Sequence, residues 1–176
     1  MYAWEFMRAL ALSEQRGLAR FVTMQNHYNL VYREEEREMM PLCEAEEIGV
    51  IPWSPLARGM LSGTRTTLGD DSTTRSKSDA VDQILYDQPS DWDVVEAVKQ
   101  VAAQRGDKPA QVALAWLLSK PAVAAPILGA TKFAHLDDAI QAVEKQLSDE
   151  EIALLEAPYQ PHPVKGIQPS RRLRRS

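Results

Sequence analysis

The sequence is poor in cysteine and has no long apolar segment. Its one cysteine, Cys43, excludes an internal disulfide bond and is typical of a reducing compartment, so we expect a cytoplasmic location. No apolar run approaches the ~20 residues that a membrane-spanning helix needs. Glu5 and Arg8 interrupt the apolar N-terminal stretch, which argues against a secretory signal. We therefore expect no membrane partner.

An excess of positive charge is also missing. The net charge of −5 gives the chain no general electrostatic attraction to nucleic acid, so we expect no such partner. The last residues are a local exception, with Arg171, Arg172, Arg174 and Arg175 close together. A solvated, disordered terminus explains these arginines most simply, and a targeting signal or a contact with an anionic surface is the alternative. Prolines recur from Pro158 onward, which predicts an extended, unpacked tail.

The 176 residues, of which 44% are hydrophobic and 26% charged, suffice for one globular domain with a core. Periodicity predicts helices at residues 2–15, 33–47, 93–105, 108–119 and 133–146. The SDEE sequence at residues 148–151 predicts a capping box that opens a last short helix. Pro41 is expected to kink the second helix or to start its second part, with Cys43 packing on its inner face.

Strands are expected at residues 20–25, 50–53 and 122–128, between the helices. This alternation is typical of βα units around a parallel sheet, that is, of an α/β fold. Three strands cannot close an eight-stranded barrel, and the outer strands would leave backbone groups unpaired. The chain is thus either a small open sheet or part of a larger barrel. Residues 61–91 are rich in Ser, Thr, Asp and Gly and predict a long loop that is either functional or mobile.

Ligands bind where the carboxyl ends of parallel strands meet, and three such ends are predicted here. After the second strand, Trp53 offers a flat apolar ring, and residues 54–59 offer a hydroxyl, backbone amides and the Arg58 guanidinium. These groups could cradle a diphosphate, although an ordinary tight turn with a buried Trp explains them equally well. Lys132, at the start of a helix, suits a phosphate. Gln25 could pair with a carboxamide, but alone it is more simply a polar strand end.

Three long segments of the sequence resemble the aldo-keto reductase family. They are QNHYNLVYREEEREMMPLC at residues 25–43, IGVIPWSPLARGMLSG at 48–63 and PAQVALAWLLSKPAVAAPILGATKFAHLDDAI at 109–140. The resemblance runs from Tyr2 to about Tyr159 in the family's order and is strongest for its aryl-alcohol-dehydrogenase-like members. It implies a (β/α)8 TIM barrel, of which residues 1–159 would be the C-terminal half, with residues 160–176 as an extended or disordered basic tail.

The resemblance also implies that NADP(H) lies across the carboxyl face of the barrel, without a Gly-rich Rossmann loop. Gln25 would hydrogen-bond the nicotinamide carboxamide, and Trp53 would stack on the nicotinamide ring. The implied diphosphate ligands are Ser54, Pro55, Leu56, Ala57 and Arg58. The implied adenosine-end ligands are Gly129, Thr131 and Lys132 at the ribose and its 2′-phosphate, with His135 and Asp138 above them. Two positions depart from the family: Thr64 where a Lys is frequent and Ala139 where an Asn is frequent.

The family reduces carbonyl groups with an Asp, a Tyr, a Lys and a His, all of which would precede Met1. No residue present is a convincing substitute for them. His27 is more simply a polar loop residue than a pocket residue, and Tyr28 and Tyr32 have no Lys at a suitable spacing. Glu34, Glu35 and Glu36 are expected to be solvated rather than to bind a metal ion. We therefore predict no catalytic residue in this chain.

Three functions remain open on the sequence alone. The first is an NADP(H)-dependent oxidoreductase that interconverts aldehydes or ketones and alcohols, of which this chain is one part. The second is a catalytically inactive remnant, and the third is a nucleotide-binding or regulatory subunit. Whether the chain by itself is an enzyme is left open. The open edges of the predicted sheet also lead us to expect self-association.

Overall fold

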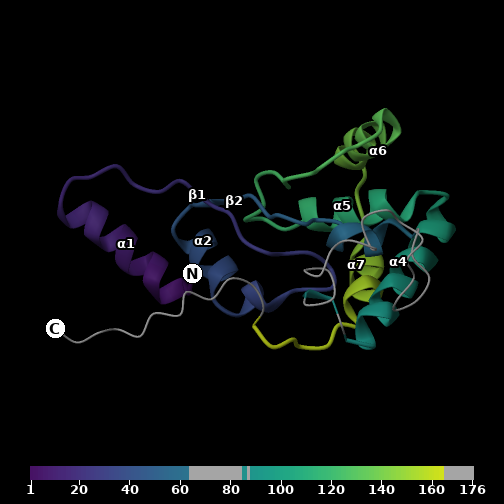
Figure 1. The fold of residues 1–176 in the computed structure, drawn as a ribbon, viewed down its shortest axis with the longest axis horizontal. Helices are drawn as coiled ribbons and strands as arrows, with labels where there is room; N and C mark the ends of the chain where they lie inside the picture. Colours follow the sequence, from purple (N-terminus) through teal and green to yellow (C-terminus); the bar gives the residue numbers. More distant parts are fainter. Residues whose placement is uncertain (64–84, 87, 165–176) are drawn as a thin grey trace.

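The computed structural model describes residues 1–63, 85, 86 and 88–164. Their helices are α1 (Ala3–Gln15), α2 (Met39–Ala45), α4 (Ser90–Arg105), α5 (Pro109–Leu118), α6 (Phe133–Val143) and α7 (Asp149–Glu156). Two short 3-10 helices are η1 (Glu34–Arg37) and η2 (Ala57–Ser62), and the strands are β1 (Thr23–Met24) and β2 (Gly49–Val50). Helices α4, α5 and α7 gather at one end of the molecule and α1 lies at the other, with the strands and α2 between them (Figure 1).

The sheet is parallel and open. Thr23 and Met24 of β1 pair in register with Gly49 and Val50 of β2. A third segment, residues 122–127, joins the other side of β2 through isolated parallel bridges, Val50 with Val123 and Trp53 with Ile127. The predicted α/β fold with three parallel segments is therefore confirmed, and the sheet is not closed. All three segments are shorter than predicted. β1 and β2 have two paired residues each, and residues 122–127 pair only through single bridges.

The helices follow the sequence signals that predict them. Pro109 is the first residue of α5, where its missing N–H has no partner to lose, and Gly106 ends α4 in the left-handed region, with φ of 69°. The predicted capping box is present in α7: Glu151 N donates to Ser148 Oγ at 3.2 Å, and Ser148 N donates to Glu151 Oε2 at 2.8 Å. Helix α4 begins at Ser90, earlier than predicted, and α6 ends at Val143 instead of residue 146.

The predicted helix over residues 33–47 is two elements. The backbone of Glu38, with φ of −143°, separates η1 from α2. Pro41 is the third residue of α2, where no helical partner for a backbone N–H exists, so the proline starts the second part without breaking it. Met39, Met40 and Cys43 are buried in the core below the sheet, as expected for the inner face.

One face of the sheet is covered and the other is not. Met24, Val50 and Val123 are buried in the core with the side chains of α2, whereas Thr23, Gln25 and Ala124, at the alternate positions, are exposed. In a strand, alternate residues point to opposite faces, so the exposed set marks one face of the sheet. Within the described residues no helix has the length and apolar character needed to cross a membrane.

The chain beyond Pro158 is packed, which corrects the prediction of an unpacked tail for its first residues. Glu34, 9% exposed, accepts hydrogen bonds at one oxygen from Tyr159 Oη at 2.7 Å and from the backbone N of His162 at 2.8 Å. Arg37 Nε donates to its other oxygen at 2.6 Å. His162 Nε2 also lies 2.7 Å from Asp91 Oδ1, with both side chains 1% exposed. Glu34 is thus an anchor for the tail instead of a solvated surface group. The arginine-rich end and residues 64–84 lie outside the described residues.

This anchor predicts a pH-dependent stability. Burial raises the pKa of Glu34, but the hydrogen bonds from Tyr159, Arg37 and His162 outweigh it and hold the pKa below its usual 4.5. A carboxyl with a lowered folded-state pKa stabilises the fold fully above its unfolded pKa and loses that contribution as the pH falls through the folded pKa. We expect Glu34→Gln to lower the urea midpoint of unfolding at neutral pH. Below about pH 4.5, the midpoint of this variant should decrease less with falling pH than that of the unaltered chain.

The matched control is Glu38→Gln, since Glu38 is exposed and follows η1 directly. Its urea midpoint should fall with acid as in the unaltered chain. If Glu34→Gln and Glu38→Gln gave the same acid profile, the anchoring role of Glu34 would be wrong.

Candidate functional site

The carboxyl ends of the three parallel segments are held at one level. Trp53 N donates to Asn26 O at 2.9 Å, and Ile127 N donates to Pro52 O at 2.8 Å. Parallel bridges link His27 with Trp53 and Trp53 with Ile127. Gln25, Trp53 and Gly129 therefore end neighbouring segments along one edge of the sheet, which is the arrangement that the sequence predicts.

The turn after Trp53 has an unusual backbone. Ser54, Ala57 and Arg58 have φ of 56°, 46° and 52°, and Gly59 has φ of 100°. Only Gly adopts the left-handed region without cost, and each other residue there costs about 1–2 kcal/mol. Ala57 N donates to Ser54 O at 3.0 Å, and Gly59 N donates to Leu56 O at 2.9 Å, which hold the turn closed. Strained residues of this kind cluster at functional sites, although Glu47, before β2, also has a positive φ of 54°.

The turn divides the predicted diphosphate ligands into two groups. Pro55 and Ala57 are buried, while Ser54, Leu56 and Arg58 are half-buried. The first two can therefore contribute the shape of the turn, and the last three can reach a ligand with side-chain atoms. Ser54 is already engaged on both sides, since its carbonyl accepts from Asn29 Nδ2 at 2.9 Å and its Oγ lies 3.1 Å from Tyr86 Oη.

The third strand end is open to solvent. Gly129, Thr131, Lys132 and His135 are exposed, and Lys132 directly precedes α6, whose first turn presents backbone N–H groups. No atom lies within 4 Å of the place where a Cβ of Gly129 would be, so the space in front of it could take a bound group. Lysine and a helix N-terminus together favour an anion. Asp138 differs from the others, because Lys108 Nζ pairs with its carboxylate at 2.7 Å.

Around Trp53 lies a group of rings that the sequence does not predict. His27 is 4% exposed and stacks on the Trp53 indole, with ring centroids 4.1 Å apart and planes 13° apart. Tyr32 stacks on the other face of the imidazole, at 4.3 Å and 12°. Tyr86 Oη lies 2.6 Å from His27 Nε2. His27 is thus a buried part of the site and not a polar loop residue. Its place in the sequence does not signal this, because Gln25, two positions earlier on the same side of the extended chain, is exposed.

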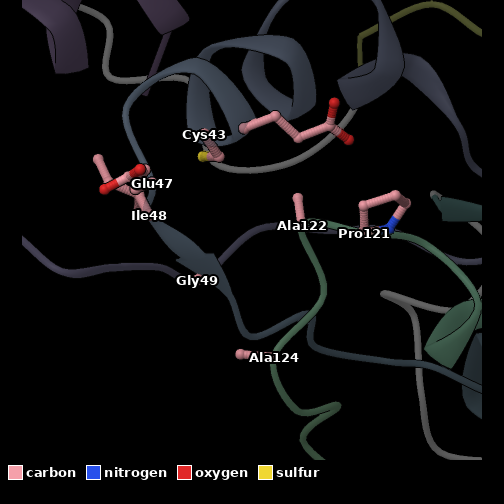
Figure 2. A pocket seen from close by; sticks show the side chains of 8 residues that line it. Cys43, Glu47, Ile48, Gly49, Pro121, Ala122 and Ala124 are labelled. Atoms are coloured by element: carbon pink, nitrogen blue, oxygen red, sulfur yellow. The ribbon is translucent and has the colours of Figure 1, made fainter.

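A separate hollow of about 470 Å³ lies at the opposite end of the sheet. Figure 2 shows it between α2, the start of β2 and residues 121–124, with Cys43, Ile48 and Ala122 on its walls. Burial raises the pKa of the Cys43 thiol to about 11, so the thiol is protonated at neutral pH and is no nucleophile. Cys43 is fully buried and packs as a small apolar residue, as predicted.

Comparison with known proteins gives a consistent result. The Aldo/keto reductase family model matches residues 1–160. A putative aryl-alcohol dehydrogenase of Schizosaccharomyces pombe is 41% identical over 94% of this chain and 46% of its own length. Versiconal hemiacetal acetate reductase of Aspergillus parasiticus is 40% identical over 98% of this chain and 49% of its own length. An aldo-keto reductase of Alternaria alternata is 39% identical over 94% of this chain and 44% of its own length.

The chain therefore spans about half the length of the curated relatives that it matches. An open sheet of three parallel segments agrees with this share, because a barrel needs more strands to close. With a family match over nine-tenths of its length and its strand ends aligned as that fold requires, the chain belongs to the aldo/keto reductase family.

Proposed function

We propose that this chain forms the cofactor-binding part of an NADP(H)-dependent oxidoreductase that interconverts aldehydes or ketones and alcohols. The observation that carries the proposal is the alignment of three strand ends around the strained turn after Trp53. The names of the relatives, which include reductases and dehydrogenases, support the same class of reaction. A small aryl or aliphatic carbonyl compound or alcohol is the substrate class, and a reducing cytoplasm suits the free Cys43.

The residues present fit a dinucleotide phosphate. Gln25 is exposed at the first strand end, where its amide can pair with a carboxamide, and the half-buried Trp53 ring beside it can take a flat aromatic ring. Ser54 and Arg58 then follow with a hydroxyl and a guanidinium. At the third end, Gly129 and Thr131 would line the ribose, and Lys132 at the start of α6 would hold the 2′-phosphate. His135 and Asp138, on the first turns of α6, would lie over the adenosine.

In the proposed role the bound NADP(H) supplies or accepts the hydride, and this chain binds and orients it. The reaction also needs a proton donor, and the two tyrosines whose pKa values are shifted, Tyr28 and Tyr159, are poorly suited to that role. Burial, together with the neighbouring Glu36, raises the pKa of Tyr28, and burial together with Glu34 raises that of Tyr159. Both phenols donate to carboxylates and are thus poor general acids. We propose that the catalytic Asp, Tyr, Lys and His of the family come from outside this chain.

The poor acidity of the Tyr28 and Tyr159 phenols supports a second function. A chain that binds NADP(H) without turning over a substrate would be an inactive remnant or a nucleotide-binding, regulatory subunit. Cofactor binding is common to both functions, and they differ in turnover. The two properties are therefore tested separately.

Cofactor binding and the role of Lys132 are tested by titrating NADPH and NADH into the chain and following tryptophan fluorescence. We expect quenching by NADPH. Lys132→Gln should weaken NADPH binding about tenfold, because a charge-assisted hydrogen bond to the 2′-phosphate contributes about 1.5–3 kcal/mol. NADH binding should hardly change, since NADH lacks that phosphate.

Lys99→Gln is the control, because Lys99 is a partly exposed lysine on α4 that forms an ion pair with Glu96. It should bind both cofactors as the unaltered chain does. Absence of quenching at high micromolar NADPH would show that the chain holds no cofactor site.

Turnover is tested with the unaltered chain, NADPH and benzaldehyde. We expect NADPH to bind but its absorbance to stay constant, because the phenols of Tyr28 and Tyr159 donate to Glu36 and Glu34 and are poor general acids for a carbonyl substrate. A chain heated to loss of structure supplies the baseline. Steady aldehyde-dependent loss of NADPH above this baseline would place a complete catalytic centre in this chain.

We also propose that the chain self-associates through its exposed apolar side chains. Helix α6 presents Phe133, Ile140 and Val143 on one side, with 87%, 60% and 69% of their surface exposed. Phe21 and Val22, directly before the outer strand β1, are also exposed. Exposed apolar side chains and an open strand edge both favour association.

Sedimentation velocity over a range of concentrations tests this self-association. The weight-average sedimentation coefficient of the unaltered chain should rise with protein concentration. Ile140→Glu combined with Val143→Lys should reduce that association, because charges replace the apolar side of α6. Leu154→Glu is the matched control, because Leu154 is 47% exposed and lies on α7 instead of on the apolar side of α6. This variant should associate as the unaltered chain does. A single monomeric species for the unaltered chain throughout would refute the proposal.

A further inference from the structure

We infer that His27 is a positioning residue that fixes the plane of the Trp53 indole from behind. The imidazole lies flat against the indole, with centroids 4.1 Å and planes 13° apart. Planes this close to parallel leave no room for a second ring on that face. A ligand ring can therefore stack only on the opposite face of Trp53. For the nicotinamide ring this consequence rests on the proposed function, whereas the fixing of the indole does not.

The imidazole is itself clamped. Tyr32, fully buried, stacks on its far side with centroids 4.3 Å and planes 12° apart. Tyr32, His27 and Trp53 thus form a column of three nearly parallel rings, which we call the ring column. An aromatic column in a buried position permits little rotation of its central ring, because any tilt would collide with both neighbours.

Hydrogen bonds fix the two loops that supply the ring column. Asn29 Oδ1 accepts from the backbone N of Val31 and of Tyr32, both at 3.0 Å. The Nδ2 of the same side chain donates to Ser54 O at 2.9 Å, in the turn that follows Trp53. Asn29 therefore ties the loop that carries His27 and Tyr32 to the turn that carries Trp53.

The Tyr86 hydroxyl fixes the in-plane direction of the imidazole. It lies 2.6 Å from His27 Nε2, accepts from Asn29 Nδ2 at 3.1 Å and lies 3.1 Å from Ser54 Oγ. One buried oxygen thereby joins the ring column to the first residue of the strained turn. Because these supporting groups are already fixed, the binding of a ligand ring does not carry the entropy cost of ordering the Trp53 side chain.

Two variants of His27 separate the ring from the hydrogen bond. His27→Phe keeps a flat ring in the column and loses the contact with Tyr86, whereas His27→Gln keeps a polar group for Tyr86 and loses the ring. We expect the near-ultraviolet circular dichroism and the indole N–H resonance of Trp53 to change strongly in His27→Gln and little in His27→Phe. Trp53→Phe identifies the Trp53 signals by their loss. This comparison uses the chain without cofactor.

The second comparison uses NADPH and isothermal titration calorimetry, which does not depend on the tryptophan signal. His27→Gln should raise the dissociation constant about tenfold, and His27→Phe should stay within about twofold of the unaltered chain. A purely stabilising role for His27 would move the urea midpoint but would not separate the two variants in this way.

Tyr32→Phe and Tyr32→Leu repeat the test on the outer ring of the column, and they keep it decisive if a His27 variant fails to fold. Tyr32→Phe should leave the Trp53 signals in place and Tyr32→Leu should shift them. In the unaltered chain, the imidazole carbon-bound protons of His27 should be shifted upfield by the rings on both sides.

The outcomes separate this inference from the proposed function. Equal Trp53 signals in the ring-keeping and ring-losing variants, or His27 protons at ordinary positions, would overturn the ring column. If the column is intact but the unaltered chain binds no NADPH, the proposed function fails and the fixing of Trp53 by His27 stands.

Discussion

The backbone pairing of residues 50–53 with both neighbouring segments is the constraint on which the described structure depends. Val50 N donates to Ala122 O at 2.7 Å and Val50 O accepts from Ala124 N at 2.8 Å, while Ile51 N donates to Met24 O at 2.9 Å on the other side. This central segment therefore sets the register of the other two. The same register brings α2 against one face of the sheet and the three strand ends to one edge. Loss of this pairing would separate the ring column and the candidate site together.

Sequence reasoning succeeded where signals are local and failed where partners are distant. Pro109, Gly106 and the Ser148 capping box act within one helical turn, so the sequence alone could place α4, α5 and α7. The burial of Glu34 depends on Tyr159 and His162, more than a hundred residues away. The three strand ends could be predicted because βα order implies a common edge. His27 could not, because its burial depends on Tyr32, Trp53 and Tyr86 meeting around it.

Family membership and the share of the relatives' length explain the unequal covering of the sheet. The face with Met24, Val50 and Val123 has the packing of a finished core, while the face with Gln25 and Ala124 is exposed. In a closed barrel the second face would be an interior filled by residues from all strands.

The Glu34 anchor bears on where the folded unit ends. The family match stops at residue 160. His162, two positions later, is nevertheless part of the packed structure: its backbone N donates to Glu34, and its ring contacts Asp91. A boundary drawn from sequence similarity would cut the chain inside this buried cluster and remove the hydrogen bonds of His162 to Glu34 and Asp91. Expression boundaries, fusion junctions and tags for this chain therefore belong beyond Pro163, because the tail up to that residue is part of the packed structure.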